Sequence, residues 1–62
     1  MKSTYDIGDF HFECGDVNAN TWVGIRVFKY SIEEEFFGFD GKGEAAFRAR
    51  CYEVHKELTR KR

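Results

Sequence analysis

The sequence predicts an α+β domain in which a three-stranded antiparallel sheet packs against one C-terminal helix, in the order β-β-β-α. Three observations predict this class. Apolar and polar residues alternate in the N-terminal half, clusters of turn-forming residues separate the alternating segments, and an apolar stripe of helical period runs along the C-terminal third. A chain of 62 residues has room for one small core, so we expect residues 1–62 to form a single domain.

The first two strands are predicted from period-2 alternation. In residues 5–14, the apolar positions from Phe10 to Cys14 alternate with polar and charged ones, which is typical of a strand with one solvated face. The turn formers of residues 15–20 then predict a hairpin loop. Residues 21–30 alternate again and are predicted to form the second strand.

The third strand is less regular. A turn near Ser31 would let residues 34–39 pair with the second strand. Strand parity leaves two arrangements open, one that buries Phe37 together with Phe39 and one that buries Phe36 alone. A β-bulge in this strand is compatible with the pattern.

A helix is predicted from Glu44 onward, capped by Asp40 or a glycine that follows it. Its apolar residues recur at i, i+4, i+7 and i+11, which forms one stripe along the helix. The stripe, which we expect to pack on the sheet together with Phe10, Phe12, Val23, Ile25 and Val27, consists of Phe47, Cys51, Val54 and Leu58.

The second face of the sheet has no further predicted layer to cover it, and it combines aromatic and acidic residues. Aromatic side chains with a polar rim are typical of protein–protein interfaces. The sequence therefore predicts a small, non-enzymatic protein-binding module, such as a regulator or inhibitor of the kind that phages encode. The predicted partner-binding residues are Asp9, Glu13, Trp22, Arg26, Phe28, Tyr30, Glu33 and Glu35.

Catalysis, cofactors and metals are not expected. A chain this short rarely builds an enclosed site, and no nucleophile, base and orienting group stand in a recognisable pattern. His11, Cys14, Cys51 and His55 are residue types that bind zinc, but strand parity places His11 and Cys14 on opposite faces. The two cysteines are expected to be buried free thiols.

Three short segments resemble AP2-type DNA-binding domains, within residues 22–46: WVGIR at 22–26, FGFD at 37–40 and EAA at 44–46. The resemblance implies a three-stranded sheet on a helix and DNA as the partner, although the first strand here is acidic where that family is rich in arginine. Only Trp22 and Arg26 carry over as contacts. An alternative function is therefore an AP2- or integrase-arm-like DNA-binding domain, whose nucleic-acid contacts would be Trp22, Arg26, Arg48, Lys56 and Arg60.

Location and assembly are predicted only in outline. No apolar run approaches the ~20 residues that a membrane span needs, and residues 1–6 lack the apolar stretch of a signal peptide. We therefore expect a cytoplasmic protein without a membrane partner. The small core is also compatible with a homodimer.

Overall fold

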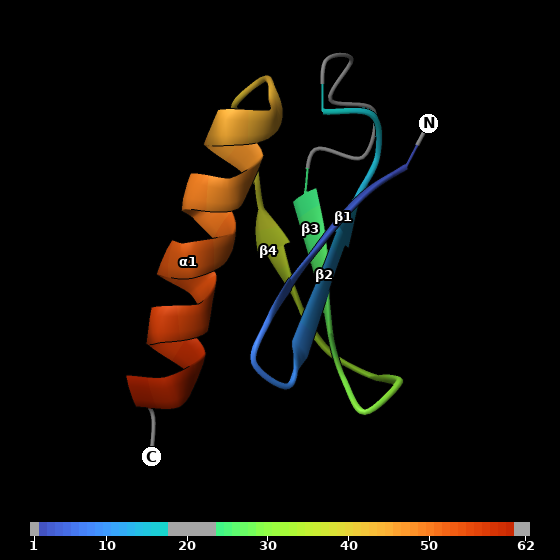
Figure 1. Ribbon diagram of the computed structural model, residues 1–62, viewed down its shortest axis with the longest axis vertical. Helices are drawn as coiled ribbons and strands as arrows, with labels where there is room; N and C mark the ends of the chain where they lie inside the picture. The colour runs from blue at the N-terminus through green and yellow to red at the C-terminus, as the bar shows by residue number, and fades with distance from the viewer. Residues whose placement is uncertain (1, 18–23, 61–62) are drawn as a thin grey trace.

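The computed structural model describes residues 2–17 and 24–60, in which four strands precede one helix. The elements are β1 (Ser3–Ile7), β2 (Phe10–Cys14), β3 (Gly24–Lys29), β4 (Ile32–Gly38) and α1 (Glu44–Arg60). The strands form one antiparallel sheet in the order β1-β2-β3-β4, and α1 lies against one face of it (Figure 1). The predicted α+β class, an antiparallel sheet with one C-terminal helix, is confirmed.

The predicted count of three strands is wrong, because the first predicted strand is a hairpin. β1 and β2 are joined by Gly8 and Asp9, and Ile7 pairs with Phe10 across this two-residue turn. Gly8 has a φ of 59°, which glycine adopts without steric cost and which a tight hairpin turn requires at this position. The four-stranded sheet has β1 as one edge strand and β4 as the other.

A β-bulge in β4 resolves the arrangement that parity left open. Phe28 pairs with Glu33 but Val27 pairs with Glu35, so β4 contains one extra residue at this point. Beyond the bulge, Phe37 pairs with Ile25 and faces the helix, and Phe36 points to the opposite side of the sheet. The first arrangement is therefore the correct one: Phe39 is buried, Phe37 is partly buried and Phe36 is exposed.

The core lies between the sheet and α1. Its largest fully buried side chains are Phe12, Ile25 and Val27 from the sheet and Phe47, Cys51 and Val54 from the helix. The predicted helical stripe is thus confirmed, with Leu58 packed against the core from a partly buried position. Val23, also predicted for the core, lies outside the described residues. Outside the bulge in β4, every second residue of the strands therefore points away from the helix.

The start of the helix is tied to the segment that follows β2. The Gly43 N–H donates to the Val17 carbonyl at 2.9 Å, and the Phe47 N–H donates to the Gly43 carbonyl at 3.1 Å. Gly43 therefore occupies the N-cap position, with a φ of 92° that only glycine adopts readily. The prediction that a glycine after Asp40 caps the helix is confirmed.

The two cysteines are free thiols in the core, as predicted. Burial, with a smaller contribution from Cys14, raises the pKa of the Cys51 thiol to about 12. Burial also raises the pKa of Cys14, whose thiol donates a hydrogen bond to the Gly15 carbonyl at 3.0 Å. Neither cysteine forms a thiolate near neutral pH, so both act as small core residues rather than as nucleophiles.

Candidate functional site

The sheet face opposite α1 is the candidate site, and we call it the open face. The strand register aligns its side chains in two rows across the four strands. The first row consists of Thr4, Glu13, Arg26 and Phe36, and the second of Asp6, His11, Phe28 and Glu33. Each of these residues alternates with a helix-facing neighbour, so the pairing that builds the core also builds the open face.

Among the described residues, α1 is the only layer packed on the sheet, and it lies on the other side. Phe36 is consequently 55% exposed. Its ring lies over Gly24 of the neighbouring strand, where a Cβ atom would overlap the ring. Phe28 is half-buried, with its ring centroid 6.1 Å from that of His11. The aromatic rings of the open face therefore lie in two places, the His11–Phe28 pair on β2 and β3 and the Phe36 ring on edge strand β4.

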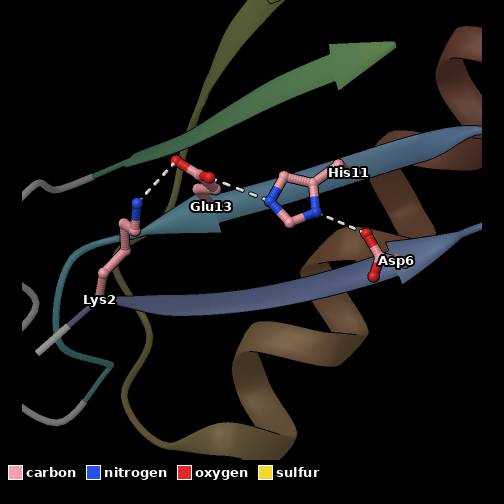
Figure 2. Close-up of polar contacts among 4 residues, drawn as sticks. All are labelled: Lys2, Asp6, His11 and Glu13. Carbon is pink, nitrogen blue, oxygen red and sulfur yellow. Dashed lines mark hydrogen bonds and ion pairs between the residues drawn. The ribbon is translucent and has the colours of Figure 1, made fainter. Parts of the chain in front are cut away.

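A polar network surrounds His11 on the open face (Figure 2). His11 Nδ1 is 2.5 Å from Asp6 Oδ1, and His11 Nε2 is 3.0 Å from Glu13 Oε2. The other oxygen of Glu13, Oε1, pairs with Lys2 Nζ at 3.5 Å. The hydrogen bond to Asp6, together with Glu13, raises the pKa of His11 against the opposing effect of partial burial.

Four of the eight predicted partner-binding residues lie on the open face: Glu13, Arg26, Phe28 and Glu33. Asp9 and Tyr30 instead lie in the two hairpin turns at one end of the sheet, where the Tyr30 hydroxyl donates to Asp9 Oδ2 at 3.0 Å. Glu35 pairs with Val27 and so lies in a row on the helix side, exposed on edge strand β4. Trp22 lies outside the described residues.

Sequence reasoning missed three residues of the open face: Thr4, Asp6 and Phe36. Thr4 lies before the strand predicted at residues 5–14, and Asp6 lies within it. The Gly8-Asp9 dipeptide, a known hairpin signal, would place both on a separate edge strand. Phe36 depends on the position of the bulge, which no pattern in the sequence specifies.

The residues predicted to contact nucleic acid do not share one surface. Arg26 lies on the open face, whereas Arg48, Lys56 and Arg60 lie on α1, on the other side of the sheet. Arg48 is also engaged within the domain, since it pairs with Glu44 at 3.8 Å and its guanidinium carbon lies 5.5 Å from the Tyr5 ring centroid. One duplex therefore cannot contact both sets through a single face of the protein.

The four zinc-type residues are likewise separated, with His11 on the open face and Cys14 and Cys51 in the core. Within residues 2–17 and 24–60, no three His, Cys, Asp or Glu side chains are grouped so as to hold a metal ion. The helix in this part of the chain is too short and too polar to cross a membrane.

In comparison with known proteins, no protein-family model, no curated protein and no solved structure matches this chain. The resemblance to AP2-type domains accordingly stays a prediction, and inferences about function depend on the geometry of the open face.

Proposed function

We propose that this protein is a small, non-enzymatic module that binds another protein through the open face. The observation that supports this proposal best is the exposed Phe36 ring, which shares with Phe28 a sheet face that has no described layer over it. Burying exposed aromatic surface in a complex is favourable, at roughly 25 cal/mol per Å² of apolar area. Aromatic residues at the centre of a polar rim are typical anchors of protein interfaces.

The charges on the open face favour a protein over a nucleic acid. Asp6, Glu13 and Glu33 contribute three carboxylates, whereas the described lysine and arginine cations are Arg26 and Lys2, and Lys2 already pairs with Glu13. Nucleic-acid binding depends on neutralising phosphates with Lys and Arg. Each carboxylate near a phosphate repels it and so weakens the binding. A face that combines exposed aromatic rings with acids is instead compatible with a protein partner, as expected of a small regulator or inhibitor that acts by occupying a surface of its target.

Capture experiments with surface variants test this proposal. The immobilised domain would be incubated with lysate of the cells that produce it, with and without nuclease treatment. The bound proteins would be identified and their affinities measured. Phe36→Ala is expected to weaken binding at least tenfold, because interface aromatics typically contribute 2 kcal/mol or more. The double variant Phe28→Ala/Phe36→Ala should abolish capture, and circular dichroism would verify that each variant is folded.

Tyr52→Ala is the matched control. Tyr52 is 54% exposed, almost the same as Phe36, but it lies on α1 on the other side of the molecule. Binding that survives Tyr52→Ala and is lost with Phe36→Ala supports the open face. Equal binding by wild type and Phe36→Ala, or loss of all bound material on nuclease treatment, would contradict the proposal, and the second result would favour the DNA-binding alternative.

A further inference from the structure

His11 contacts two carboxylates at once, and this arrangement depends on its protonation state. Its Nδ1 lies 2.5 Å from Asp6 Oδ1 on β1, and its Nε2 lies 3.0 Å from Glu13 Oε2 on its own strand. An ionised carboxylate only accepts hydrogen bonds, so both ring nitrogens must carry a proton for both contacts to form. The structure therefore shows the geometry of the imidazolium form (Figure 2).

A neutral imidazole has a single N–H and can donate to only one of these carboxylates. The second carboxylate would then face the lone pair of the other ring nitrogen, which repels it. Of the two, Asp6 is well exposed and can exchange its histidine contact for water, and Glu13 keeps its ion pair with Lys2. Loss of the proton therefore releases one acidic side chain on the open face.

The surroundings of His11 contain other charges that bear on this equilibrium. Besides Asp6 and Glu13, the described charged residues of the open face are Lys2, Arg26 and Glu33, while α1 lies on the other side of the sheet. Phe28 on β3 flanks the ring on the side away from β1. The two nearest groups are thus both anionic, and they favour the charged imidazole.

We propose that His11 is a pH-dependent switch for the open face. In the protonated state one imidazolium engages Asp6 and Glu13 together, and in the neutral state one carboxylate is free to pair with a Lys or Arg of the bound protein. This inference rests on the proposed function and specifies the partner chemistry: a basic protein surface, bound more tightly as the pH rises through the His11 transition.

The first part of the proposal is tested on the isolated domain by following the ring resonances of His11 with pH by NMR. Because hydrogen bonding to Asp6 and Glu13 raises the pKa of His11 above its ordinary 6.5, the wild-type midpoint should exceed that of the urea-unfolded chain. Asp6→Asn should lower the midpoint, and Asp6→Asn/Glu13→Gln should lower it further. A wild-type midpoint equal to the unfolded value would overturn the switch, whatever the domain binds.

The raised pKa of His11 also determines in which direction the stability of the domain changes with pH. A raised folded-state pKa means that the histidine contacts stabilise the domain fully below about pH 6.5 and that this stabilisation is lost as the pH rises through the folded-state midpoint. The urea midpoint of the wild type should therefore fall between about pH 6 and pH 8 by more than that of His11→Gln. Parallel curves for the two proteins would contradict the inference.

The second part uses a pentaarginine peptide as the probe of a basic surface. Its affinity for the domain, followed by amide shifts in β1 to β3, is expected to rise about two- to fivefold from pH 5.5 to pH 8, the range of one exposed ion pair. The His11→Gln variant is the control for every other group that titrates, and its peptide affinity should change less with pH. If the NMR midpoint is raised but wild type and His11→Gln bind the peptide with the same pH profile, the switch does not control binding. A switch that passes both tests while Phe36→Ala leaves partner capture unchanged would locate the failure in the proposed function instead.

Discussion

Replacing Phe47 with alanine is expected to lower the free energy of unfolding by about 3–5 kcal/mol. Phe47 is fully buried in the first turn of α1 and packs edge to face on Phe39, with ring centroids 6.1 Å apart. A domain of 62 residues has a total stability of about 3–9 kcal/mol, so this one cavity removes most of it. Urea denaturation followed by circular dichroism would measure the loss.

Phe36→Ala is the matched control for this prediction. The same side chain is removed, but from a position that is 55% exposed on the open face, so the expected cost is about 1 kcal/mol or less. The contrast separates a core phenylalanine from one that is available to a partner. Similar losses at the two positions would mean that Phe36 is structural and would remove the main support for the proposed interface.

Replacing Ile25 with aspartate is expected to unfold the domain. Ile25 is fully buried on β3, opposite Cys14 on β2 and Phe37 on β4. The substitution loses about 1.5–3 kcal/mol of apolar burial, and it places a carboxyl group where no polar partner is available, which costs several kcal/mol more. The sum is comparable with the entire stability of the domain, so the amide NMR spectrum should collapse to that of an unfolded chain.

The same change at Ile32 tests the assignment of faces. Ile32 is 67% exposed at the start of edge strand β4, so Ile32→Asp should leave the spectrum dispersed and cost about 1 kcal/mol or less. A dispersed spectrum for Ile25→Asp, or an unfolded chain for Ile32→Asp, would show that the strand register is incorrect.

The helix and the central strands could be predicted from the sequence because their pattern is local. Phe47, Cys51 and Val54 repeat at helical spacing, and Phe10 and Phe12 alternate with charged residues, so each set identifies its buried side without knowledge of the rest of the chain. The same alternation correctly placed Glu13 and Arg26 on the face away from the helix.

The alternation of the sequence does not predict the first hairpin as one regular strand pattern, because its phase changes at the turn. Tyr5 and Ile7 occupy odd positions, whereas the buried residues from Phe10 onward occupy even ones, so the alternation changes phase across Gly8 and Asp9. A two-residue turn produces this shift, since Ile7 and Phe10 face each other across it. The phase change places Asp6 opposite His11, and this contact is the one on which the proposed switch depends.

The position of Phe36 could not be predicted, because it depends on the bulge in β4. With three consecutive glutamates in this strand, hydrophobic alternation gives no preference for where the extra residue falls. The structure places it between the pairs Phe28–Glu33 and Val27–Glu35, and this sends Phe36 to the open face. The exposed aromatic that supports the proposed function is therefore a consequence of tertiary pairing.

Site-specific photocrosslinking tests the central claim, that the open face binds a protein, most directly. A photoreactive phenylalanine analogue would replace Phe36 on the open face or, as the control, the exposed Ala49 on α1, and both proteins would be irradiated in nuclease-treated lysate. We predict one discrete crosslinked protein from position 36 and none from position 49. A crosslinked protein from position 49 but not from position 36, or no crosslinked protein from either position, would contradict binding through the open face.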